Sequence, residues 1–171
     1  MGFREEVSEP FPAKYIIALA PHTSNWDFII GMLFCRAKDF NCNFLMKKEW
    51  FFWPMGVLFR SMGGIPVERS RHVSLTDRVA EAAIKAERFE LAVTPEGTRS
   101  LATKWKRGFY FIALKAGLPI QLYAIDYKNK RIVCTKELVP SGDVEADMRL
   151  IMDYYRPYEG KYPGKFAVED I

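Results

Sequence analysis

Long apolar runs are absent from this sequence. The longest, from Trp50 to Phe59, is interrupted by Pro54 and falls far short of the roughly 20 apolar residues that a membrane-spanning helix needs. The N-terminus has no apolar core of a signal peptide, and Glu6 stands where a myristoylation signal requires Ser or Thr. We therefore expect a cytoplasmic protein that meets a membrane only peripherally, from the cytoplasmic face.

Cysteine is scarce and follows no ligand spacing. Cys35, Cys42 and Cys134 are odd in number and form no Cys-x-x-Cys pair, so neither a zinc site nor a disulfide framework is expected. Reduced, partly buried thiols are the simpler interpretation. We accordingly expect no metal ion and no other cofactor.

Dense runs of Lys and Arg are also missing, although the net charge is +4. Because no zinc-finger or aromatic RNA-binding signature accompanies this charge, we expect no nucleic-acid partner. The charge favours a surface that meets anions such as lipid phosphates or an acidic protein. A mildly basic soluble protein would show the same balance.

Strands and helices alternate along most of the 171 residues. Strands are expected at 15–20, 43–46, 65–68, 91–93, 118–127 and 131–138, the last two joined as a hairpin by a turn at 128–130. Helices are expected at 28–37, 75–89, 109–116 and 144–155, with Ser141 or Asp143 capping the last. The pattern predicts a single α/β domain over residues 1–171, a sandwich with helices around a largely parallel, mixed sheet. Residues 157–171 are rich in Gly, Pro and Lys, which favours a loose C-terminal tail.

Two polar segments follow predicted buried strands: His22 to Asp27 and Pro95 to Arg99. In open α/β sheets ligands bind beyond the carboxyl ends of strands, so both segments are expected to line one cleft. An Asp near a helix start turns back toward the preceding loop, where it can accept the Nδ1 proton of His22 and leave Nε2 to take a proton from a hydroxyl. The competing interpretation is that His22 bonds to its loop and Asp27 only caps the helix.

The second segment has the composition of an anion site. Gly97 lets backbone amides approach an anion closely, and Arg99 can hold a phosphate with two hydrogen bonds. An ordinary surface turn with an exposed arginine is the alternative.

Together these residues resemble the glycerol-3-phosphate and 1-acylglycerol-3-phosphate (lysophosphatidate) acyltransferase family. The segment from His22 to Asp27 resembles the family's His-x4-Asp motif, residues 64–69 its second block, Pro95 to Arg99 its Pro-Glu-Gly-Thr-Arg block and residues 116–120 its proline-centred fourth block. Residues 47–49 and 107–109 resemble two further basic elements. The blocks occur in the family's order over about residues 16–125, which makes the joint resemblance specific.

The resemblance implies a reaction and a set of roles. An acyl group would pass from an acyl carrier protein or coenzyme A thioester, the only co-substrate, to the hydroxyl of a lysophospholipid, without an acyl-enzyme. The leading acceptor is 1-acylglycerol-3-phosphate, which would give phosphatidate. His22 would be the general base and Asp27 its orienting partner. Pro119 would shape the acyl-donor region. The acceptor would be bound by Lys47, Arg69, Glu96, Gly97, Thr98 and Arg99.

Several positions depart from the family pattern. Pro21 precedes His22 where the family often has Asn, Glu68 replaces a commoner Asp, and Thr94 stands where Phe is usual. Because of these departures, the resemblance does not fix the identity of the acceptor. The alternatives are another lyso-lipid such as lyso-ornithine lipid, a non-catalytic phospholipid-binding module, or a thioesterase that uses water as the acceptor.

The aromatic segment from Trp50 to Phe59 follows two lysines. Such a segment suits the interface of an anionic membrane. A buried aromatic cluster would have the same composition.

Overall fold

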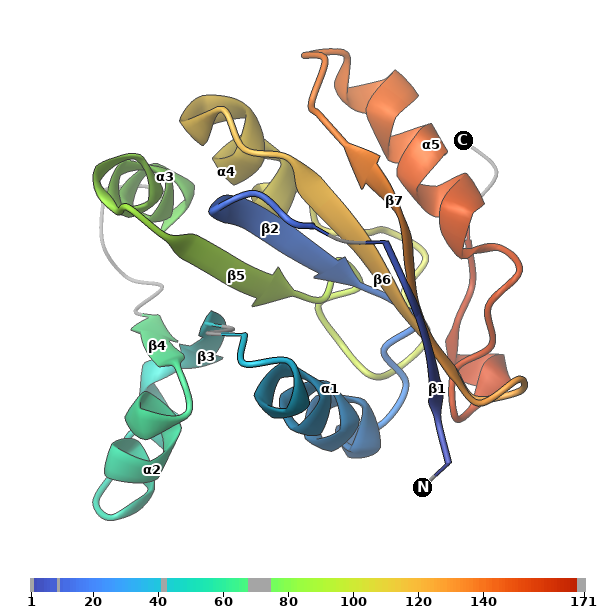
Figure 1. Cartoon of the computed structure of the whole chain (residues 1–171), viewed down its shortest axis with the longest axis horizontal. Helices are drawn as coiled ribbons and strands as arrows, with labels where there is room; N and C mark the ends of the chain where they lie inside the picture. The colour runs from blue at the N-terminus through green and yellow to red at the C-terminus, as the bar shows by residue number, and fades with distance from the viewer. Residues whose placement is uncertain (1, 9, 41–42, 68–74, 169–171) are drawn as a thin grey trace.

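The computed structural model describes residues 2–8, 10–40, 43–67 and 75–168. Within them seven strands form one sheet in the order β1-β7-β6-β2-β5-β3-β4 (Figure 1). The strands are β1 (Arg4–Val7), β2 (Lys14–Leu19), β3 (Asn43–Lys47), β4 (Gly64–Val67), β5 (Phe89–Val93), β6 (Ile120–Asp126) and β7 (Arg131–Leu138). Neighbouring strands are parallel except in the β6–β7 hairpin. The expected largely parallel, mixed sheet is confirmed.

Helices cover both faces of this sheet (Figure 1). The helices are α1 (Asn25–Ala37), α2 (Met55–Ser61), α3 (Leu75–Lys85), α4 (Gly108–Ala116) and α5 (Val144–Tyr155), with short 3-10 turns η1 (Lys48–Trp50) and η2 (Pro163–Lys165). In β2, Ile16 and Ala18 join the core beneath α3, α4 and α5, whereas Tyr15 and Ile17 join a second core beneath α1. This alternation follows from the two-residue period of a strand. No helix in the described ranges is long and apolar enough to cross a bilayer.

Most helix ends follow the sequence signals. Asp143 caps α5 through a bond from the backbone N–H of Ala146, and Gly117 ends α4 in the left-handed conformation. The helix expected at 75–89 is too long, because α3 ends at Lys85 and Phe89 already belongs to β5. Ser74, which with Asp77 has the spacing of a capping box for this helix, lies outside the described residues.

Four features differ from expectation. β1 forms an extra edge strand, and α2 forms a helix within the aromatic segment. The loose tail is wrong for the part that is described, because Phe166 and Val168 pack against the larger core and η2 is an ordered turn. Cys35 is disulfide-bonded, so the expectation of reduced thiols fails there. Cys134 is a buried free thiol, and burial raises its pKa to about 12.

Candidate active site

The two polar segments leave the same edge of the sheet. β2 and β5 are parallel neighbours, with Ala18 opposite Val93, so the loops that follow them emerge together. The backbone N–H of His22 donates a 2.6 Å hydrogen bond to Oε1 of Glu96. The two segments that were expected to line one cleft are therefore in direct contact.

Local helix-start chemistry places Asp27. Ser24 is the N-cap of α1, and Asp27, three residues later, completes a capping box. Its Oδ2 accepts hydrogen bonds of 2.8 Å from the backbone N–H groups of Thr23 and Ser24. Asp27 is fully buried, so these bonds fix the carboxylate at one orientation directly behind the His22 loop.

His22 lies against this carboxylate. Its Nδ1 is 3.2 Å from Oδ2 of Asp27, and 16% of its side chain is exposed. The contact is close but poorly directed, since Nδ1 has no well-aligned hydrogen-bond acceptor. Catalytic hydrogen bonds commonly tighten only when substrate is bound. The structure brings His22 and Asp27 together as the spacing predicts, and their catalytic role stays a prediction.

Tyr127, which follows β6, binds the second oxygen of the Asp27 carboxylate. Its phenol O–H donates a 2.6 Å hydrogen bond to Oδ1 of Asp27. Burial on its own would raise the pKa of Asp27. The contact with His22 and the hydrogen bonds from Tyr127, Ser24 and Thr23 outweigh burial, so the pKa lies below its ordinary value. Asp27 is thus held as an anion although no solvent reaches it, which suits a group that stabilises a protonated imidazole.

Glu96 lies beneath the loop and does not face the solvent. Only 2% of the residue is exposed. Burial raises the pKa of its carboxyl from 4.5 to about 8, helped by the charge of Asp27 and opposed by the bond from His22. Its Oε2 is buried without a hydrogen-bond partner in the described parts of the chain. This position makes Glu96 a support for the His22 backbone.

The C-terminal segment covers the same loop. The backbone N–H of Tyr162 donates to the hydroxyl of Thr23 at 3.2 Å, and that of Tyr127 donates to the carbonyl of Glu159 at 2.9 Å. A Cβ on Gly160 would lie 2.7 Å from the side chain of Thr23. Only glycine allows this approach, so residues 159–162 pack directly onto the loop that carries His22 and Thr23.

The remaining residues of the Pro95 to Arg99 block face outward. Gly97 adopts a positive φ of 67°, and the hydroxyl of Thr98 accepts a bond from the backbone of Ser100. Gly97, Thr98 and Arg99 are exposed, and no carboxylate of the described residues forms an ion pair with Arg99. This arrangement leaves the guanidinium accessible to a ligand.

Lys106 adds a cation that the sequence patterns did not single out. A Cβ on Gly97 would lie 3.0 Å from Cγ of Lys106, so the lysine side chain runs across the glycine. The neighbouring Arg107, which belongs to the predicted basic element, is instead bound to Glu145 of α5. The signal that could have found Lys106 is the adjacency of two basic residues to Gly108.

Arg69, Lys47 and Pro119 are the remaining predicted site residues. Arg69 lies outside the described residues, and of Lys47 only the backbone, at the end of β3, is described. Pro119 precedes β6, and its carbonyl accepts a bond from Ile16 near the start of β2. At about 3.3 Å per residue, that end of β2 is roughly 20 Å from His22. Considering only the described ranges, no group of His, Cys, Asp and Glu side chains could hold a metal ion.

An apolar cavity of about 80 Å³ lies next to Asp27, between α1 and the sheet. The carboxylate residue Asp27 lines one side of it, and the remaining walls are formed by residues such as Phe28, Met32, Phe44 and Tyr123. An apolar space therefore begins next to the carboxylate.

The aromatic segment between β3 and β4 is largely exposed. Trp53 is 84% exposed, and Trp50, Phe52, Val57 and Leu58 are each at least half exposed. Phe51 and Phe59 pack on each other. A buried aromatic cluster is therefore wrong for most of this segment.

Comparison with known proteins agrees with the geometry. A family model described as Acyltransferase matches residues 3–126, well over half of the chain. The chain belongs to the acyltransferase family. The predicted assignment of the chain as an acyltransferase is therefore confirmed.

A solved structure shares the fold of this family member. It is the crystal structure of the 1-acyl-sn-glycerophosphate (LPA) acyltransferase, PlsC, from Thermotoga maritima. The two are 17% identical with a TM-score of 0.59, over 87% of this chain and 69% of that chain. The likeness shows a common architecture. No curated protein matches the sequence.

Proposed function

We propose that this acyltransferase moves a fatty acyl group from an acyl carrier protein or coenzyme A thioester to the free hydroxyl of a lysophospholipid. The acceptor that fits most directly is 1-acylglycerol-3-phosphate, which would give phosphatidate. The observation that carries the proposal is the contact of His22 Nδ1 with a buried, ionised Asp27. The fold shared with the Thermotoga maritima enzyme, a 1-acyl-sn-glycerophosphate acyltransferase, supports the same acceptor.

The chemistry follows from the geometry of the pair. Asp27 holds the Nδ1 side of the imidazole, and none of the described residues binds Nε2. The acceptor hydroxyl gives its proton to Nε2 while its oxygen forms a bond to the thioester carbonyl carbon. The tetrahedral intermediate then expels the thiolate, which takes the proton back from the imidazolium. Base catalysis of this kind is worth about 10²–10⁴-fold.

The exposed cations beside the pair suit the phosphate of the acceptor. Arg99 and Lys106 both lie at the Gly97 turn, whose preceding residue Glu96 touches the His22 backbone. A phosphate held there places the adjoining glycerol hydroxyl near His22. We assign Glu96 itself to positioning, because it is buried and bound to the main chain.

The cavity next to Asp27 is evidence that the transferred acyl group is apolar. Each buried water needs about 10–15 Å³ of such space, so about 80 Å³ has room for a handful of methylene groups. Its apolar walls favour hydrocarbon over a polar substrate.

The exposed aromatic segment supports peripheral contact with an anionic membrane. Trp50, Phe52 and Trp53 are exposed next to Lys48, an arrangement typical of interfacial segments. Changing Trp50 and Trp53 to Ser should weaken binding to anionic vesicles in a protein that remains folded. Unchanged binding would reject this contact.

The experiment that tests the function is a product assay. Purified protein is incubated with acyl-CoA or acyl carrier protein thioesters and a panel of lyso-lipids, and the products are read by mass spectrometry. We expect phosphatidate from lysophosphatidate and little free fatty acid. Free fatty acid alone would make the protein a thioesterase, and no turnover with any acceptor would contradict the proposal.

A further inference from the structure

Helix α1 carries an apolar stripe that faces away from the sheet. Trp26, Ile29 and Leu33 are exposed, Leu33 by 55%, and their spacing places them on one side of a helix. The adjoining side of the helix packs inward through Asp27 and Ile30, which are buried. A surface helix normally turns polar residues outward, so this stripe is unusual for a face that meets only water.

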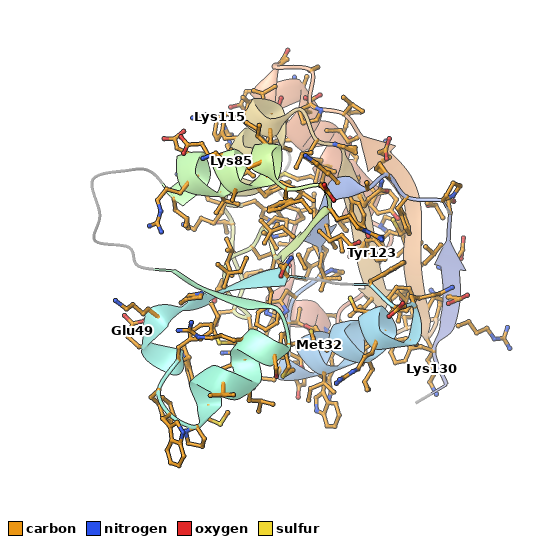
Figure 2. The ribbon with its side chains drawn as sticks, turned by 60° about the vertical axis from the view of Figure 1, so that its left-hand side comes forward. Met32, Glu49, Lys85, Lys115, Tyr123 and Lys130 are labelled. Carbon is orange, nitrogen blue, oxygen red and sulfur yellow. The ribbon has the colours of Figure 1, made fainter. Side chains whose placement is uncertain are left out.

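Helix α2 lies next to α1, at the same lower side of the molecule in both views (Figures 1 and 2). A groove of about 360 Å³ runs between their C-terminal ends, with Met32 and Arg36 of α1 on one wall and Arg60 and Met62 beside α2 on the other. Figure 2 shows Met32 on the side of α1 that faces α2. Helix α2 adds the exposed apolar side chains of Val57 and Leu58.

Cations border both apolar surfaces. Arg36 and Arg60 are exposed, and within the described chain neither pairs with a carboxylate, although Asp39 also lines the groove. Lys161 lies 4.8 Å from the ring centre of Trp26, and Arg60 lies 5.6 Å from that of Phe51. Cations next to aromatic and aliphatic side chains match the boundary between acyl chains and anionic headgroups.

We propose that the exposed faces of α1 and α2 form one docking surface for an anionic phospholipid bilayer, with Arg36 and Arg60 taking lipid phosphates at the groove between the helices. The purpose of this surface rests on the proposed function. Because α1 begins three residues after His22, docking through α1 would hold His22 and Asp27 at the lipid surface. Lipid binding itself is measured without acyl transfer.

The test compares matched variants on vesicles of phosphatidylcholine with phosphatidylglycerol and on vesicles of phosphatidylcholine alone. The α1 variant combines Ile29→Ser with Leu33→Ser, and its control is Leu150→Ser on α5, where Leu150 is 47% exposed. The α1 variant should bind anionic vesicles at least about tenfold more weakly, because it lacks two exposed aliphatic side chains that the bilayer would bury. The control should bind like the parent protein.

The groove is tested by combining Arg36→Ala with Arg60→Ala, against Arg149→Ala on α5. The groove variant should lose about tenfold in binding to anionic vesicles, as expected for two cations near an anionic surface, and should not change on neutral vesicles. Thermal melting verifies that every variant is folded. Parent-like binding by the folded α1 variant, or an equal loss in the α5 controls, would overturn the docking surface.

A second readout separates this inference from the proposed function. The α1 variant should acylate a soluble short-chain lyso-lipid at the parent rate and a vesicle-bound acceptor more slowly. Loss with both acceptors would contradict a role confined to docking. If the parent protein acylates neither acceptor, the proposed function fails, and the vesicle binding still decides the docking surface.

Discussion

The phenol of Tyr127 donates a 2.6 Å hydrogen bond to Oδ1 of Asp27, a residue 100 positions earlier in the chain. The bond comes from the turn after β6 and reaches the first turn of α1, so it ties the catalytic helix to the centre of the sheet. Together with the two backbone N–H groups on Oδ2, it keeps a fully buried carboxylate charged.

Tyr127→Phe should therefore weaken catalysis more than acceptor binding. A hydrogen bond to a charged group is worth about 1.5–3 kcal/mol, so we expect kcat to fall about tenfold or more with a smaller change in KM. Because Tyr127 lowers the pKa of Asp27, its loss should raise that pKa, which the ¹³C chemical shift of the Asp27 carboxyl reports in an NMR pH titration. Tyr154→Phe, which removes a hydroxyl bonded to Thr135, is the control. An Asp27 pKa that is unchanged in Tyr127→Phe would show that the phenol does not tune Asp27.

Glu96 should make stability depend on pH. Its pKa is 4.5 when unfolded and about 8 when folded, so between these values the folded state holds the proton more tightly. Burial of Glu96 therefore lowers the free energy of unfolding little below about pH 4.5, and it lowers that free energy increasingly as pH rises to about 8. Glu96→Gln keeps an oxygen for the backbone of His22 and removes this cost.

The free energies of unfolding of Glu96→Gln and the parent protein should thus diverge in favour of glutamine as pH rises through that window. Denaturant titrations at several pH values measure the difference. A constant difference from pH 4.5 to pH 8 would mean that the Glu96 carboxyl has an ordinary pKa.

Gly160→Ala should disturb the catalytic loop from the C-terminal side. The added Cβ would lie 2.7 Å from both Cγ2 and Oγ1 of Thr23, and overpacking of this kind costs about 1–3 kcal/mol. We expect a lower melting temperature together with a lower kcat, since Thr23 also binds Asp27. Gly164→Ala, which meets no atom within 4 Å, should change neither.

Arg99→Ala should mainly affect acceptors that carry a phosphate. Losing a charge-assisted bond to phosphate raises KM for lysophosphatidate by about tenfold or more and leaves a neutral monoacylglycerol acceptor unaffected. Arg88→Ala is the matched control, because Arg88 is an exposed arginine before β5, at the other end of that strand. Equal losses in the two variants, or a loss with both acceptors, would remove Arg99 from the phosphate site.

Sequence patterns predicted those features of the fold that depend on residues close together in the chain. The alternation and the turn at 128–130 located the β6–β7 hairpin, and the capping residues near Ser24 brought Asp27 back toward His22. β1 escaped prediction because its residues Arg4 to Val7 are mostly charged and exposed, and edge pairing with β7 holds them in place.

Contacts between residues far apart in the chain could not be predicted from such patterns. No spacing links Tyr127 to Asp27, since the contact depends on how β6 and α1 meet. The composition of the C-terminal segment is typical of a loose tail, yet the missing Cβ of Gly160 is what lets it pack on Thr23. Glu96 was placed with the acceptor by resemblance, whereas its burial directs it to the main chain of His22.

The most direct test of the proposed mechanism is the acyl transfer rate of His22→Ala with an acyl thioester and lysophosphatidate. The variant keeps the backbone N–H that binds Glu96, so it should melt near the parent temperature and still bind the acceptor. We predict that its rate falls by about 10²-fold or more, as expected when a general base is removed. Transfer at the parent rate by the folded variant would contradict the assignment of His22 as the base.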